Sequence, residues 1–191
     1  MTGPGGFTNI AAFAGVDEAA ETPLGAFAVN ILPRWTLVVS NSPTDWGSVS
    51  PPGGEFVQGS VVSLTATPAE YFRFLDWSGA ASGTNLHLQL AIESNSVVVA
   101  RFGEILTTNH PTPLWWLASF GASGDFETAV VQTGANGLPL WESYVAGLVP
   151  TNAGSVLALG VSVQADGLTV LAWPSVSGRV YTVSATTNLA A

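Results

Sequence analysis

Alternating apolar and polar residues predict two β-strands near the end of this chain, over 168–173 and 179–185. Leu171 and Trp173 fall on one face of the first strand, and Tyr181, Val183 and Ala185 fall on one face of the second. A period of two is typical of a sheet with one buried face. A Val-Ser-Gly turn joins the two strands, and we expect a third strand to pair with them.

A third run with the same alternation lies near the start, over 25–32. Phe27, Val29 and Ile31 share one face, and smaller residues occupy the other. Burying three such side chains stabilises a fold by roughly 5–9 kcal/mol, at about 1.5–3 kcal/mol each. This strand therefore needs a partner sheet, and we expect it to be the strand missing from the sheet at the other end of the sequence.

Between residues 34 and 104, short apolar-alternating runs are separated by SNSPTD, SPPGGE, TPAE, SGAASGTN and ESNS. These spacers consist mostly of residues that favour turns. The pattern predicts strands over 36–40, 47–50, 60–67, 72–77, 86–90 and 96–102. A compact β module is expected here.

Helical signals are confined to residues 112–151. Thr112 followed by Pro113 predicts a helix start, and Gly121 predicts its end. Asp125 is placed to cap a second short helix, and a third, over 139–146, is expected to stop at Gly147. After this connector the sequence returns to strands, beginning with one expected over 155–164.

Composition agrees with a mainly β protein and restricts its partners. The net charge is −9, with four arginines, no lysine and no cysteine among 191 residues. This balance disfavours binding to nucleic acid or to an anionic membrane. No apolar run is long enough for a membrane span, and no basic region marks a signal peptide. Few charges and many turn residues indicate an extracellular or cell-surface protein, secreted through a leader that is not visible here.

The β module resembles the internalin B-type repeat of bacterial surface proteins. The resemblance rests on a GSVSP hairpin, a G-x-x-V-x-L-x-A-x-P strand, an F-x-x-W-S-G turn and a final V-x-A-x-F strand, all in order. Tyr71 departs from a usual glycine and His87 from a usual proline. The resemblance implies a small β-grasp-like domain, usually in tandem, that serves as a spacer or adhesive module.

The connector resembles a degenerate EF-hand or thrombospondin type 3 segment, with the loop QTGANGLPLWES before the helix. Aligning its turn glycine on Gly137 places four residues at ligand positions: Gln132, Gly134, Asn136 and Ser143. None is a carboxylate, whereas Ca²⁺ takes six to eight oxygen ligands that usually include several carboxylates. We therefore expect no metal and no other cofactor, with calcium bound at most weakly through Asn136 and backbone carbonyls.

The last segment, VLAWPSVSGRVYTVSATTNL, resembles the middle of a fibronectin type III or immunoglobulin-like sandwich. The continuation expected in such a domain stands at the start of this sequence, over 6–32. The chain thus divides into a terminal strand segment (1–33), the repeat (34–104), a linker and helical connector (105–151), and the first part of a sandwich (152–191). The strand donor is Phe27, Val29 and Ile31, and the acceptor sheet presents Leu171, Trp173, Tyr181 and Val183.

Catalytic patterns are weak. His87 and His110 are the imidazoles of the chain, in a predicted strand and a linker, and no Gly-x-Ser-x-Gly motif occurs. Asp125 and Glu127 suit helix capping better than paired acid catalysis. Trp46, beside Asp45 in a turn, is the tryptophan expected to be exposed, as a contact for a ligand or, equally, for another domain. We expect no enzymatic activity.

The sequence thus predicts an extracellular structural protein whose split sandwich closes by strand complementation. The strand 25–32 could pair with 168–185 of its own chain or with a neighbouring copy or repeat, and the intervening module favours the neighbour. Such subunits would form a head-to-tail filament or a tandem-repeat surface protein. Two alternatives remain: a monomeric adhesin that binds glycan or a surface protein, and an accessory region of a secreted hydrolase.

Overall fold

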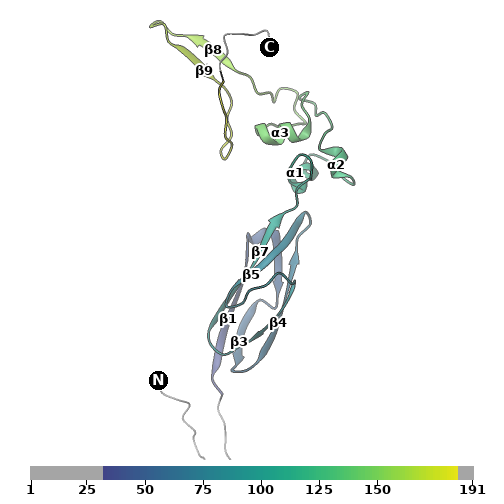
Figure 1. Cartoon of the computed structure of the whole chain (residues 1–191), viewed down its shortest axis with the longest axis vertical. Helices are drawn as coiled ribbons and strands as arrows, with labels where there is room; N and C mark the ends of the chain where they lie inside the picture. The colour runs from purple at the N-terminus through teal and green to yellow at the C-terminus, as the bar shows by residue number, and fades with distance from the viewer. Residues whose placement is uncertain (1–31, 185–191) are drawn as a thin grey trace, which may run out of the picture. The chain divides into compact units, whose positions relative to one another are not determined.

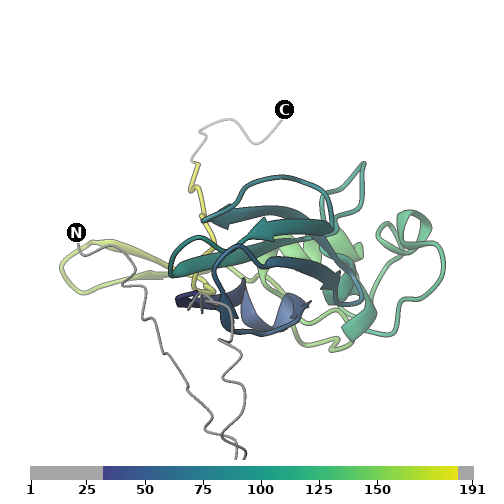
Figure 2. The same ribbon diagram turned by 90° about the horizontal axis from the view of Figure 1, so that it is seen from below.

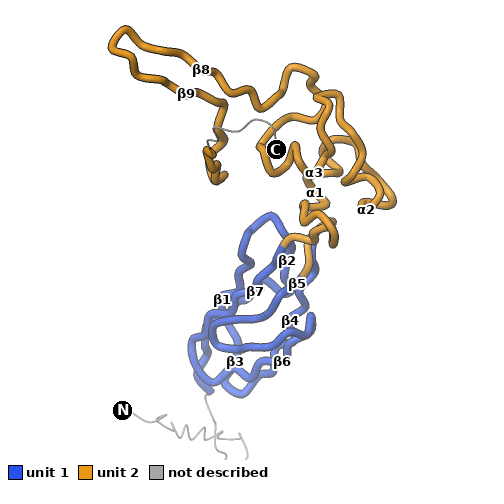
Figure 3. Tube along the Cα trace, turned by 45° about the horizontal axis from the view of Figure 1, so that its top comes forward, with its two compact units in different colours: residues 1–69, 74–103 blue, residues 70–73, 104–191 orange. Residues whose placement is uncertain are grey.

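A computed structural model describes residues 32–184 of the chain (Figure 1). They divide into two compact units (Figure 3): unit 1 comprises residues 32–69 and 74–103, and unit 2 comprises 70–73 and 104–184. Residues 25–31 of the predicted donor strand, which include Phe27, Val29 and Ile31, lie outside the described residues.

Unit 1 is built from two β-sheets. Its elements are β1 (Arg34–Ser42), the 3-10 turn η1 (Thr44–Trp46), β2 (Gly47–Ser50), β3 (Gly53–Val57), β4 (Val61–Pro68), β5 (Phe72–Gly79), β6 (His87–Ala91) and β7 (Ser96–Glu104). One sheet has the order β3-β1-β7-β5 and the other β2-β4-β6. β1 pairs antiparallel with β3 but parallel with β7. The pairs β2–β4 and β4–β6 are antiparallel.

The core of unit 1 lies between the two sheets, which pack face to face (Figure 2). Leu37 and Val98 come from one sheet and Leu64 from the other, and each has at most 1% of its surface exposed. The remaining buried members are Val62, Ala66, Trp77, Ile92, Ala100 and Phe102. Alternate residues of β4 are buried, as the period of two requires. The mainly β fold expected from the sequence is confirmed.

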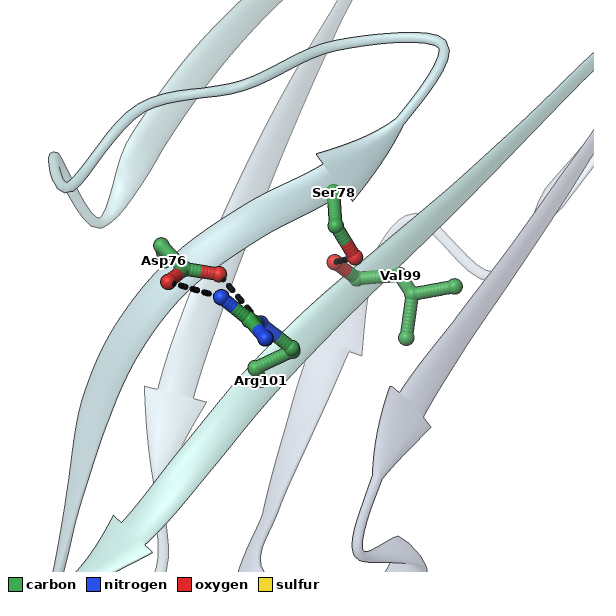
Figure 4. A network of polar contacts seen from close by, with 4 residues as sticks. All are labelled: Asp76, Ser78, Val99 and Arg101. Carbon is green, nitrogen blue, oxygen red and sulfur yellow. Dashed lines mark hydrogen bonds and ion pairs between the residues drawn. The ribbon is translucent and has the colours of Figure 1, made fainter.

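Strand β5 departs from strict alternation. Phe74 packs against Trp77, three residues away, at 5.3 Å between ring centroids, and against Phe102 at 5.8 Å. Phe74 and Trp77 therefore both reach the core. The residue between them that faces away, Asp76, accepts two hydrogen bonds from the Arg101 guanidinium on β7, at 2.6 and 2.5 Å (Figure 4). These bonds and the positive charge lower the pKa of the Asp76 carboxyl.

All six expected strands of this module form, with ends shifted by at most two residues, and the structure adds a seventh. The sequence predicts a turn at SPPGGE, but β3 begins at Gly53 and pairs with β1. A Cβ on Gly53 would lie 2.3 Å from the Leu37 carbonyl oxygen, and its φ is +95°. Glycine therefore allows a close strand pairing that a side chain would prevent.

Unit 2 contains the helical connector, with α1 (Leu114–Ser119), α2 (Phe126–Ala129) and α3 (Leu140–Ala146). Asp125 caps α2 as predicted, accepting hydrogen bonds from the Glu127 and Thr128 amides. Gly147 ends α3 with a φ of 71°. The predicted cap at Thr112 is wrong, because that residue is buried and its hydroxyl donates to the His110 carbonyl at 2.8 Å. Pro113 occupies the N-cap of α1 instead.

Tyr71 has a left-handed backbone conformation, with φ 68°. This is the position at which the resembled repeat usually has glycine, because left-handed conformations disfavour residues with a Cβ. The Tyr71 ring packs edge-on against Phe126 of α2, with 5.7 Å between centroids, and its carbonyl accepts from the Ile105 amide at 3.0 Å. The ring contact offsets part of the backbone cost.

Candidate functional site

The last described strands, β8 (Gly160–Val163) and β9 (Thr169–Ala172), form a two-stranded antiparallel sheet by themselves. Every residue of β8 is exposed, including Val161 at 63%. Other exposed large apolar residues of this segment are Val156, Leu157, Leu159, Val163, Leu168, Leu171, Val176, Val180 and Val183. An isolated two-stranded hairpin is marginally stable in water. Within residues 32–184 this hairpin has no third strand.

The strand predicted over 179–185 does not form at residues 179–184. Val183 is 52% exposed there and belongs to no sheet. Tyr181 instead donates its hydroxyl to the Ala146 carbonyl at 3.3 Å and accepts from the Val176 amide at 3.1 Å. A strand requires a neighbour for its backbone hydrogen bonds. Without one among the described residues, this segment folds against the end of α3.

A cleft of about 580 Å³ lies beside β9. Three of the predicted acceptor residues, Leu171, Trp173 and Tyr181, line it together, and Val183 does not. The rest of the lining is Ala172, Ser175, Val176, Ser177, Gly178 and Arg179. The indole Nε1 of Trp173 is buried without a hydrogen-bond partner. The cleft thus combines apolar and aromatic side chains with the polar residues Ser175, Ser177 and Arg179.

Two residues that line this cleft, Val176 and Arg179, contact α3 or the glycine that ends it. The Arg179 guanidinium lies 4.3 Å from the centre of the Tyr144 ring, a cation–π contact. The Val176 side chain occupies the space above Gly147, where a Cβ would approach it to 2.6 Å. The segment 173–181 is therefore placed by the helical connector, a relationship that strand periodicity could not indicate.

The loop that resembles a calcium site is closed by its own side chains. Asn136 is 8% exposed and Ser143 is fully buried, and the Asn136 Nδ2 donates to the Ser143 Oγ at 2.9 Å. The same amide nitrogen lies 3.3 Å from the Ser155 carbonyl, and the Asn136 Oδ1 accepts from the Leu138 amide. Gly134 pairs with Leu138 through backbone. Two residues at predicted ligand positions thus satisfy each other directly.

The remaining predicted ligand position, Gln132, is exposed, and its backbone carbonyl accepts from the Leu140 amide at 3.0 Å. Gln132 and Gly134 line a second cleft, of about 370 Å³, beside Phe120 and Pro150. Among residues 32–184, no three His, Asp or Glu side chains gather as a metal-binding group.

Among residues 32–184, neither histidine hydrogen-bonds to a carboxylate. His87 Nδ1 lies 3.1 Å from the Thr65 hydroxyl across β4 and β6. The His110 ring stacks on Trp141, with 4.6 Å between centroids and 14° between planes.

The expectation that Trp46 is exposed is corrected. Its side chain is half-buried and packs against the core of unit 1. Trp115 is instead the most exposed tryptophan in the part of the chain that the structure describes, with 39% of its surface accessible. Its Nε1 donates to the Glu104 carboxylate at 2.7 Å.

In unit 1, two small sheets enclose one core, and the first and last strands are adjacent. Residues 37–106 match the family model of the divergent InlB B-repeat domain. The match supports a bacterial surface repeat protein and an extracellular or cell-surface location. No helix of the described residues is long and apolar enough to cross a membrane. Searches of the curated proteins and of the solved structures found no match.

Proposed function

We propose that this chain is one unit of an extracellular structural protein assembled by β-strand complementation between neighbours. The observation that carries the proposal is the β8–β9 hairpin, whose apolar side chains remain exposed and which has no third strand within residues 32–184. Exposed apolar patches and unpaired strand edges are typical of interaction sites. The missing strand is supplied by the alternating segment 25–32 of a neighbouring copy or repeat.

Energetics favour such pairing. Covering Val161, Val163 and Leu171 would contribute about 1.5–3 kcal/mol for each side chain removed from water. The cleft lined by Trp173 and Tyr181 is large enough to receive an aromatic side chain, for which Phe27 is the candidate.

The neighbour is favoured over the same chain because the 34–104 module separates donor from acceptor in the sequence. A head-to-tail contact that does not close on itself generates a filament. Donation within one chain would instead give a circularly permuted domain and a monomer. The state of association therefore distinguishes the two arrangements.

The test is light scattering and electron microscopy of the purified chain, of a variant lacking residues 1–32, and of two matched point variants. Val161 and Val61 are 63% and 64% exposed, on β8 and β4. Val161→Asp should abolish association and Val61→Asp should leave it intact. The truncated variant should be a folded monomer. Its acceptor sheet should bind an added peptide of residues 20–32. A full-length chain that stays monomeric at high concentration would contradict the proposal.

A second candidate is a monomeric adhesin that binds glycan or a surface protein, favoured by exposed Trp115 beside the Glu104 carboxylate. It predicts a monomer whose ligand binding is lost in Trp115→Ala. Under either candidate we propose that the chain is not an enzyme. The hydroxyl beside His87 and the indole stacked on His110 support structural roles for both rings.

A further inference from the structure

The first and last strands of unit 1 lie side by side and run in the same direction. β1 and β7 pair in parallel over six residue pairs, from Leu37 with Ser96 to Ser42 with Arg101. Both are inner strands of the sheet β3-β1-β7-β5. The Thr36 amide donates to the Asn95 side chain at 2.9 Å, which extends the connection before the first pair.

This pairing sets how tension along the chain would act on unit 1. The chain enters through the start of β1 and leaves through the end of β7, at opposite ends of the ladder, because the strands are parallel. Six pairs span about 17 Å at about 3.3 Å per residue. A pull on the two ends is directed along the strands and loads all six pairs together. A pull at one end of the ladder would instead open the pairs one after another.

Packing opposes sliding of the two strands. Leu37, Val98 and Ala100 are fully buried on the core side, so a slip of one residue would turn buried positions outward. The neighbouring strands β3 and β5 also lie very close to the ladder, at Gly53 beside β1 and at Gly79 beside β7. A Cβ on Gly53 would lie 2.3 Å from the Leu37 carbonyl oxygen, and a Cβ on Gly79 would lie 2.3 Å from that of Val97.

Side chains on the face of the sheet away from the core add a further restraint near the end of β7. Arg101, which pairs with Ser42 at the last position of the ladder, is held by two charge-assisted hydrogen bonds to Asp76 of β5 (Figure 4). The Ser78 hydroxyl lies 3.4 Å from the Val99 carbonyl oxygen on the same pair of strands. β7 is therefore fastened to β5 as well as to β1.

We propose that unit 1 is a load-bearing module in which the β1–β7 ladder acts as a shear clamp. It keeps the repeat folded while the chain is under tension between its ends. This mechanical role goes beyond assembly by strand complementation and depends on different residues.

Single-molecule force spectroscopy of the full chain tests the clamp. Because the sequence has no cysteine, two introduced cysteines define the pulling points. One variant carries Leu32→Cys and Leu106→Cys, just before β1 and just after β7, and loads the ladder in shear. The other carries Leu32→Cys and Ser94→Cys, which pulls the starts of both strands apart. All three positions are exposed, so neither pair alters the core.

Forced unfolding reports the unfolding barrier along the direction of pulling. The shear variant should unfold at a several-fold higher force than the opening variant at the same pulling speed, while both have the same melting temperature. Equal unfolding forces in the two geometries would overturn the proposal. A chain that stays monomeric yet shows the force difference would contradict assembly and support the clamp. A chain that assembles but shows no difference in unfolding force would support assembly and contradict the clamp.

Discussion

Asn136 and Ser143 are joined by a buried hydrogen bond of 2.9 Å, at two positions where the resembled calcium loop would place ligands. The amide nitrogen of Asn136 is a donor, so it faces Ser143 in a way that a cation could not share. Hydrogen bonds between neutral groups therefore close the loop in front of α3.

Removing this bond should weaken unit 2. Ser143→Ala leaves the buried Asn136 Nδ2 with only the longer contact to the Ser155 carbonyl. We expect a loss of about 1–3 kcal/mol in the free energy of unfolding, measured by urea denaturation. Ser123→Ala, at an exposed serine, is the control and should change the stability little. Equal midpoints for both variants would show that the bond contributes nothing.

The same geometry predicts indifference to calcium. Gln132, Gly134, Asn136 and Ser143 offer no carboxylate, and one amide is already satisfied internally. The melting temperature of the full chain should be the same in excess Ca²⁺ and in excess chelator. A calcium-dependent rise, as expected for any ligand that binds the folded state, would restore the metal-site hypothesis.

Acid should act on unit 1 through Asp76. The Arg101 hydrogen bonds and charge lower the pKa of this carboxyl in the folded state. The pair therefore stabilises the fold above the unfolded pKa, about 3.9, and the contribution is lost as pH falls through the folded value. Urea midpoints measured between neutral and acid pH should fall more steeply for the wild type than for Asp76→Asn. Arg101→Gln should give the same flattened profile, and a wild-type slope in either variant would contradict this assignment.

Tyr71 offers a test of backbone strain against ring packing. Tyr71→Ala loses the contact with Phe126 but keeps a Cβ at a φ of 68°, whereas Tyr71→Gly also relieves the backbone. The glycine variant should be more stable than the alanine variant by about 1–2 kcal/mol. Thermal denaturation compares the two directly. An alanine variant as stable as the glycine variant would place Tyr71 outside the left-handed region in solution.

The sequence predicts unit 1 well because each strand carries its own alternating face. β3 is missed because Gly53 and Gly54 have no side chains with which to alternate. The strand predicted around Tyr181 does not form, because periodicity indicates a face and not a partner, and the Tyr181 hydroxyl donates to the Ala146 carbonyl of α3 instead. Trp46 follows a turn, which favours exposure, whereas its burial depends on the core opposite it. The spacing of the loop places Asn136 and Ser143 at ligand positions and so indicates that they lie close together. The signal for a hydrogen bond between them, in place of a metal, is the lack of carboxylates in the loop.

The positions of the four arginines determine where a trypsin-like protease can cleave the folded protein. Arg34, Arg73 and Arg101 lie within strands β1, β5 and β7, where a protease that cleaves after basic residues must first open the sheet. Arg179 lies outside any strand, in the wall of the cleft beside β9. Because the chain has no lysine, trypsin should cut first after Arg179, and a strand docked in that cleft would shield the bond. The rate of this single cleavage therefore reports whether the joint between neighbouring units is occupied.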